Sequence, residues 1–193
     1  YQGVEQRLDI AGFIDYLIVQ IYGATGDWPH NNYVMARERK DNAKWIFSLW
    51  DGEGAFGNFG NNVRTDTMAS AVANSIPTST PQTDAISLAI KILFTQLRSS
   101  DEFKLLFADR LQKHFFHNGA LVDSKILARK NALRDEMLPL ISSFADSPLN
   151  NWINGLGNTT RYNNSTNFPS RRNVLFDGYF DDVNGGSFVT GHF

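Results

Sequence analysis

The feature that most restricts the fold of this chain is an apolar run near its beginning that repeats at helical spacing. After Asp9, which can cap a helix, large apolar side chains recur three or four residues apart at Ile10, Phe13, Ile14, Leu17, Ile18 and Ile21. Gly23 then provides a typical helix end. The run predicts a mostly buried helix over residues 9–22, so the rest of the chain has to supply the elements that cover it.

A β-hairpin is predicted after this helix and a polar loop at residues 24–32. Residues 33–37 and 44–50 are rich in β-branched and aromatic side chains, and the charged connection between them contains an Asp-Asn turn signal. Glycine and asparagine dominate residues 51–62, which predicts a loop whose backbone approaches another group closely. Residues 61–83 remain polar and contain two prolines, so we expect an exposed segment there.

The second half of the chain has a helical pattern. One apolar stripe consists of Ile86, Ile90, Leu93 and Leu97. Ser99 with Glu102 predicts a capping box that begins a second helix, which Gly119 would end. Asp123 can cap a third helix, and Pro139 is expected to kink it.

The tail and the whole pattern define the expected fold class. The tail after residue 148 is rich in Asn, Gly, Ser and Thr, and weak alternation over residues 173–193 predicts short strands. The 193 residues fit one domain, residues 1–193. We therefore expect an α+β, mainly helical domain in which a small β-hairpin lies between two acidic loops.

Composition excludes several classes of site and partner. The chain has no cysteine, which rules out disulfides, zinc–thiolate sites and cysteine nucleophiles. It has 18 basic and 20 acidic residues, a balance that argues against a dedicated nucleic-acid binder. No run of apolar residues is long enough for a membrane span. The sequence is 42% hydrophobic, which is enough for a real core.

Three polar residues around the predicted hairpin have a spacing that suits phosphoryl transfer. Asp27 precedes Asn32 by five positions, the separation of the catalytic Asp and the metal-binding Asn in protein kinases. Asp51 follows the second predicted strand and begins the glycine-rich loop, where kinases carry a metal-binding Asp. Magnesium prefers oxygen ligands, so this order of residues predicts an acidic metal–nucleotide site.

The same stretch resembles the CotH family, first described in spore coats. The matching elements are Gly26-Asp27-Trp28, Asn31-Asn32, Lys44-Trp45, Trp50-Asp51-Gly52-Glu53, Ser100-Asp101-Glu102-Phe103, Asp109-Arg110, Trp152 and the segment from Arg171 to Leu175. The resemblance covers roughly residues 9–176. Glu53 stands where the family pattern has a second Asp.

The resemblance implies an atypical protein kinase that uses ATP with Mg²⁺ or Mn²⁺ and phosphorylates Ser or Thr of secreted, coat or surface proteins. It implies Asp27, Asn32 and Asp51 as catalytic and metal-binding residues, and Asn31, Asn32, Asp51 and Glu53 as contacts for the nucleotide and its metal. The chain would correspond to the carboxy-terminal lobe. None of the Lys, Glu or loop elements of an amino-terminal lobe can be identified in it, so the isolated chain is expected to bind ATP weakly or not at all.

Other interpretations remain open. The chain could be a non-catalytic binding module of a cell surface or extracellular assembly, or a carbohydrate-associated domain, and Asp27 and Asp51 could be ordinary turn residues. His30 fits an exposed loop position. His114 and His117 lie three apart on a predicted helix without an evident third metal ligand. The Arg171-Arg172 pair fits surface or packing roles better than phosphate binding.

Overall fold

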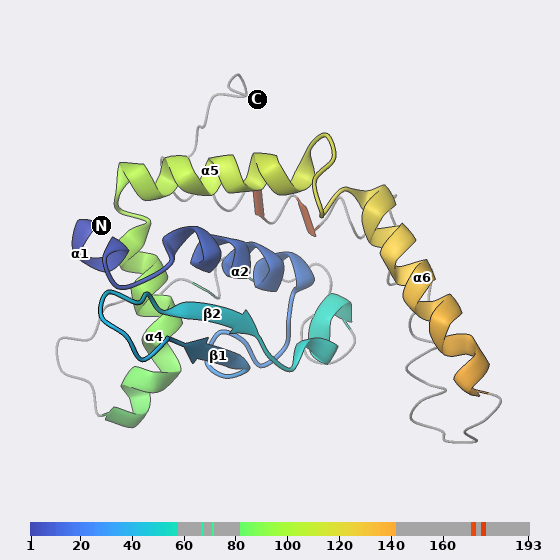
Figure 1. Ribbon diagram of the computed structural model, residues 1–193, viewed down its shortest axis with the longest axis horizontal. Helices are drawn as coiled ribbons and strands as arrows, with labels where there is room; N and C mark the ends of the chain where they lie inside the picture. The colour runs from blue at the N-terminus through green and yellow to red at the C-terminus, as the bar shows by residue number, and fades with distance from the viewer. Residues whose placement is uncertain (58–66, 68–70, 72–81, 142–170, 173–174, 177–193) are drawn as a thin grey trace.

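A computed structural model of the chain describes residues 1–57, 67, 71, 82–141, 171–172 and 175–176 (Figure 1). Its elements are α1 (Gln2–Glu5), α2 (Ile10–Gly23), β1 (Tyr33–Ala36), β2 (Ile46–Leu49), the 3₁₀ segment η1 (Gly52–Gly57), α4 (Gln82–Leu97), α5 (Asp101–Phe115) and α6 (Asp123–Ile141). The described part is therefore mainly helical with one two-stranded antiparallel sheet, in agreement with the predicted α+β class. None of its helices is both long and apolar enough to cross a membrane.

Helix α2 is the buried helix that the apolar spacing predicted. Asp9 is its N-cap, and the Asp9 carboxylate accepts a hydrogen bond of 3.1 Å from the Gly12 N–H. A Cβ at Gly12 would lie 2.5 Å from that carboxylate, so glycine lets the cap close over the first turn. Five apolar side chains of α2 have no exposed surface: Phe13, Ile14, Leu17, Ile18 and Ile21. The helix contributes to the core on several sides, as its wide apolar stripe predicted.

The β-hairpin covers one side of α2. Strands β1 and β2 pair antiparallel, with Tyr33 opposite Leu49. The ring of Phe47 lies 4.8 Å from that of Phe13 and 5.3 Å from that of Tyr16, measured between centroids. Side chains alternate between the two faces of a strand, so the neighbours of Phe47 on β2 point away from α2. The hairpin therefore has one face on the core and one that is open.

Both strands are four residues long, which is shorter than predicted. At the start of the second predicted strand, Trp45 pairs instead with the segment before α2. The Trp45 N–H donates to the carbonyl of Arg7 at 2.7 Å, and the Asp9 N–H donates to the carbonyl of Trp45 at 3.0 Å. This parallel bridge fixes the start of α2 to the turn end of the hairpin.

Helices α4 and α5 complete the described core through aromatic contacts. The ring of Phe94 on α4 lies 6.2 Å from each of the rings of Phe103 and Phe107 on α5. Helix α5 lies along α2 (Figure 1). The capping prediction was one residue off, because Ser100 is the N-cap and accepts a hydrogen bond from the Phe103 N–H. Ser100 also donates to the Glu102 carboxylate at 2.5 Å. The predicted pairing with Glu102 is therefore made by Ser100 rather than by its neighbour Ser99.

An ion cluster joins α2 to α5. The Asp15 carboxylate on α2 accepts hydrogen bonds from Arg110 and from Nε2 of His114, the latter at 2.8 Å. Burial alone would raise the pKa of the Asp15 carboxyl, but the hydrogen bonds and charges of Arg110 and His114 outweigh it and lower that pKa. His114 thus contacts a carboxylate across the helix interface, while His117 lies beyond the end of α5.

Several predictions of boundaries and exposure need correction. Helix α5 ends at Phe115 rather than near Gly119, and Gly119 lies in the following turn, where a Cβ would be 2.2 Å from the carbonyl oxygen of His114. Pro139 lies inside helix α6, as predicted, and the described part of that helix ends at Ile141. Thr67 and Ala71 are buried, whereas the polar composition of residues 61–83 predicted exposure.

The tail is described only at two pairs of residues. Residues 171–172 and 175–176 are helical, so at 175–176 the prediction of strands was wrong. The remaining predicted strand positions, together with Trp152 and most of the tail, lie outside the described residues.

Candidate functional site

The loop that carries Asp27 begins where α2 ends. Ala24 is the C-cap of α2 in the left-handed conformation, and the Gly26 N–H donates to the Gly54 carbonyl of η1 at 3.3 Å. Trp28 is buried, and its Nε1–H donates to the hydroxyl of Tyr16 at 2.7 Å. The backbone on both sides of Asp27 is therefore fixed, while the Asp27 side chain is exposed to solvent.

Tyr16 and Gln20 on α2 hold this loop from below. Burial raises the pKa of Tyr16 to about 12, so its hydroxyl stays protonated at neutral pH and can accept the indole hydrogen bond. The Gln20 amide nitrogen lies 3.5 Å from both the Tyr16 hydroxyl and the Asn32 carbonyl oxygen. Neither supporting residue was predicted from the sequence. Their signal was available, because they are polar side chains one turn apart on an otherwise apolar helix face.

Asn32 connects the first loop to the second. It precedes β1, is half-buried, and donates from Nδ2 to the Asp51 carbonyl oxygen at 3.4 Å. Because strand pairing places Tyr33 opposite Leu49, Asn32 comes next to the residues that follow β2. The hairpin thus brings the Asn32 side chain to the backbone of Asp51.

Asp51 and η1 form the second loop. Asp51 and Glu53 are exposed, whereas Gly54 is buried where it meets the first loop. The ring of Phe56 packs edge-on against Tyr22 of α2, with 5.6 Å between centroids. These contacts tie the second loop to the same end of α2 that carries the first one.

A left-handed backbone occurs at all three of the central predicted residues. The φ angle is 55° at Asp27, 50° at Asn32 and 56° at Asp51. Asn and Asp adopt this conformation more readily than most other residues, yet it still costs roughly 1 kcal/mol relative to the right-handed one. Five of the seven non-glycine residues with positive φ in the described chain lie in the two loops, so this strain is concentrated here.

The donor atoms at these loops are suited to a hard cation. Asp27, Asp51 and Glu53 offer carboxylate oxygens, and the amide oxygen of Asn32 remains for a ligand because its nitrogen is committed to Asp51. Within the described residues, no three His, Asp or Glu side chains are grouped as a metal site. A magnesium ion commonly takes only one or two carboxylates and completes its shell with water and phosphate. The residues present fit such a partly hydrated ion.

Arg171 supports the site from far along the sequence. It is completely buried and donates from Nε to the Tyr22 carbonyl oxygen at 3.0 Å, and from Nη2 to the Ile21 carbonyl oxygen and to Oγ1 of Thr67, the latter at 2.7 Å. Thr67 donates in turn to the Ile21 carbonyl oxygen at 2.8 Å. The carbonyls at the end of α2, which a helix leaves unsatisfied, are thereby paired.

The two arginines of the predicted pair have different roles. Arg171 is a packing residue, which was one of its two expected roles. Arg172 is half-buried and lies 3.5 Å from the Asp123 carboxylate at the start of α6. His30, by contrast, is exposed on the first loop, as expected for an ordinary polar loop residue.

Comparison with known families agrees with this geometry. A sequence model of the family described as CotH kinase protein matches residues 1–167, a range that contains both loops and the hairpin between them. No curated protein and no solved structure matches the chain. The family match covers well over half of the sequence and extends across α2, the sheet and the helical half. The chain belongs to the CotH kinase family.

Proposed function

We propose that this kinase-like chain transfers the γ-phosphoryl group of ATP to Ser or Thr residues of a secreted, coat or surface protein. The observation that carries the proposal is the joining of the two loops that carry Asp27, Asn32 and Asp51, through the hydrogen bonds from Asn32 to the Asp51 carbonyl and from Gly26 to the Gly54 carbonyl. Phosphoryl transfer depends mainly on positioning and on neutralising phosphate charge, and rigidly held oxygen donors serve both needs.

Each residue has a proposed role. Asp51 is the main ligand of the metal ion, and the Asn32 amide oxygen is a second ligand. Asp27, which is exposed on the first loop, orients the acceptor hydroxyl and takes its proton. Asn31 and Glu53 contact the nucleotide or the water around its metal. Bound Mg²⁺ or Mn²⁺ would neutralise the charge of the transferred phosphate.

The open face of the hairpin offers a surface beside these ligands. Val34 is 38% exposed and follows Asn32 by two residues, and Trp50 is 61% exposed and directly precedes Asp51. An apolar and aromatic surface next to a phosphate site is what a planar base needs for stacking. We propose that the nucleotide base lies against this part of the hairpin.

The same surface favours a second candidate function. Six large apolar side chains of the hairpin region are more than a third exposed: Val34, Met35, Trp45, Ile46, Leu49 and Trp50. Exposed apolar patches often mark protein contacts. A non-catalytic binding module of a cell surface or extracellular assembly would bind through these exposed side chains and would not need the carboxylates.

Calorimetric titration with ATP, in the presence of Mg²⁺ or Mn²⁺, separates the two functions. It should be carried out on this chain and on the longest natural protein that contains it, each compared with Asp51→Ala and Asp27→Ala. Glu136→Gln is the matched control, because Glu136 is an exposed carboxylate on α6. Metal-dependent binding that Asp51→Ala abolishes and Glu136→Gln preserves is the expected result. No binding to either protein at millimolar ATP with either metal would contradict the kinase function and favour the binding module.

A further inference from the structure

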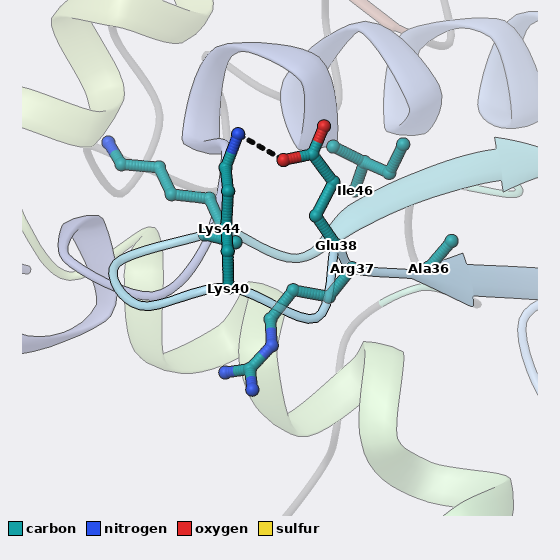
Figure 2. Close-up of a pocket in the computed structure, with 7 residues that line it drawn as sticks. Ala36, Arg37, Glu38, Lys40, Lys44 and Ile46 are labelled. Atoms are coloured by element: carbon teal, nitrogen blue, oxygen red, sulfur yellow. Dashed lines mark ion pairs between the residues drawn. The ribbon is translucent and has the colours of Figure 1, made fainter.

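A second concave site lies at the turn of the hairpin. It is a pocket of about 500 Å³ whose apolar lining comes from Ala36, Ala43 and Ile46 (Figure 2). Asn32 and Asp51 adjoin the opposite ends of the two strands, so the pocket and the acidic loops lie at the two ends of one hairpin (Figure 1). The pocket is therefore separate from the proposed metal–nucleotide site.

The charge of this pocket is opposite to that of the acidic loops. Arg37, Lys40 and Lys44 line it, against the single carboxylate of Glu38. Residues 37–44 carry four basic and two acidic side chains in a chain whose net charge is −2. The turn is thus a local basic region on a slightly acidic protein.

The contacts of the three cations show which are available. The Arg37 guanidinium lies over the ring of Trp45, 5.5 Å from its centroid. Lys40 forms an ion pair with Glu38, and both side chains are 67% exposed, so the pair is weak and exchangeable. Figure 2 shows the ammonium group of Lys44 apart from this pair. The ion pairs found among the described residues do not include Lys44.

Glu38 indicates what kind of ligand the pocket accepts. Its carboxylate forms an ion pair with Lys40 within the pocket lining, so the site already accommodates one carboxylate (Figure 2). An external carboxylate or phosphate could replace it at Lys40, and Lys44 is a second cation in the same lining, available to a neighbouring anionic group. The apolar lining between the charges suits the stem of an amino-acid side chain better than a free ion.

We propose that this pocket binds a carboxylate or phosphate group on an acidic segment of a polypeptide, held by Lys40 and Lys44. Binding itself does not depend on the proposed kinase function. Our further interpretation, that the acidic segment belongs to the substrate of the same chain, rests on that function. The pocket would then select substrates at a distance from the acceptor hydroxyl.

The length of the strand sets that distance. Five residues separate Asn32 from Arg37, which corresponds to roughly 17 Å of extended chain. An extended peptide with its acceptor at the acidic loops would place a residue about five positions away over the pocket. Asp27, Asp51 and Glu53 repel acidic residues close to the acceptor, so the preferred acidic positions should be remote ones.

Fluorescence anisotropy with three labelled peptides tests the proposal. Each peptide contains one acceptor Ser, and residues five to seven positions away are Glu, Gln or phosphoserine. We expect the Glu and phosphoserine peptides to bind and the Gln peptide to bind at least about tenfold more weakly, with affinity that decreases as salt is raised. The relative affinity of the first two peptides tells whether carboxylate or phosphate is preferred. Equal binding of the Gln peptide would overturn the proposal.

Matched variants in the same turn distinguish the pocket from general charge attraction. Lys40→Gln with Lys44→Gln should weaken binding roughly fivefold to tenfold, whereas Arg39→Gln, which removes the same kind of charge outside the pocket lining, should change it less than about twofold. Glu38→Gln should tighten binding and Asp41→Asn should not, because only Glu38 lines the pocket. Equal effects of Arg39→Gln and Lys44→Gln would overturn the pocket as the site.

A measurement without variants guards against misfolded proteins. Amide shifts in NMR spectra on addition of the Glu peptide should be largest at Ala36, Ala43 and Ile46, and shifts confined to other regions would contradict the proposal.

Phosphorylation assays separate the pocket proposal from the kinase proposal. Peptide binding without phosphorylation would contradict the proposed kinase function but would still support the pocket as a binding site. Phosphorylation of the Glu and Gln peptides at equal rates would contradict substrate selection by the pocket but would support the kinase function.

Discussion

Helix α2 and the β-hairpin touch each other, yet their exposure differs sharply. Phe13, Leu17 and Ile18 of α2 have no exposed surface, whereas Leu49 is 53% exposed and Trp50 is 61% exposed. The helix holds the two acidic loops in place, and the hairpin presents them, together with an open face, to other molecules. The difference shows that α2 stabilises the fold while the hairpin exposes the candidate binding residues. Substitutions in α2 should therefore change mainly the free energy of unfolding, and substitutions in the hairpin should change mainly binding.

The largest expected effect comes from truncating an apolar side chain in each region. Phe13→Ala should lower the free energy of unfolding by about 4 kcal/mol, because it removes a fully buried ring that packs on Phe47. Leu49→Ala should lower it by about 0.5 kcal/mol, because that side chain is largely solvated. Urea unfolding measures both. Similar losses for the two variants would show that the hairpin is as much a part of the core as α2.

Substitution of Arg171 tests whether a residue near the end of the chain also stabilises α2. Arg171→Met should cost about 3 kcal/mol of unfolding free energy, since it removes the donor to the buried Tyr22 carbonyl and one of the donors to the buried Ile21 carbonyl. The neighbouring Arg172→Met is the control and should cost less than about 1 kcal/mol, because its ion pair with Asp123 is only partly buried. A cost for Arg171→Met no larger than that of the control would exclude Arg171 as an anchor of α2.

The ion cluster between α2 and α5 makes the free energy of unfolding depend on pH. The folded-state pKa of Asp15 is below its unfolded value, so its stabilisation is present above the unfolded pKa, about 4, and is lost as pH falls through the folded pKa. Asp15→Asn should therefore lower stability at neutral pH by about 1 kcal/mol and flatten its decline in acid. Unfolding at a series of pH values measures this, with Asp109→Asn on α5 as an exposed control. A decline in Asp15→Asn as steep as in the original chain would place the acid sensitivity elsewhere.

The smallest expected effect on stability lies in the presenting region. At the left-handed backbone of Asp51, glycine is less strained than alanine, so Asp51→Gly should be about 1 kcal/mol more stable than Asp51→Ala. Both variants should lose metal-dependent ATP binding, because the carboxylate is gone in each. Thermal unfolding and calorimetry give the two quantities. Retained ATP binding in the more stable glycine variant would show that Asp51 serves the turn rather than the metal.

Local patterns in the sequence were sufficient for the helices and the hairpin. The apolar spacing from Ile10 to Ile21 and the cap at Asp9 predicted α2 almost to the residue, since a helix of this kind depends on neighbours three or four positions apart. The hairpin was predicted because its strands are adjacent in the sequence. The choice between Ser99 and Ser100 as the cap was not decidable, because both can accept the same hydrogen bond.

What the sequence could not provide depends on contacts between distant residues. The pairing of Trp45 with the segment before α2 shortened the second strand, and no local pattern marks such a bridge. Burial of Thr67 and Ala71 inside a polar stretch is likewise a tertiary effect. The hydrogen bond from Gly26 to Gly54, which joins the acidic loops, is formed by backbone atoms that every residue has. The types of the two residues therefore give no indication that this hydrogen bond forms.

The contact between Arg171 and the carbonyl of Ile21 spans 150 positions, and this separation has a consequence for synthesis. A ribosome adds roughly 5–20 residues per second, so the end of α2 waits on the order of ten to thirty seconds for its arginine. For most of that interval the nascent chain already contains the hairpin and both acidic loops, but lacks the arginine that donates to the Ile21 and Tyr22 carbonyls. Chaperones and proteases that act on nascent chains would meet the protein in this incomplete state.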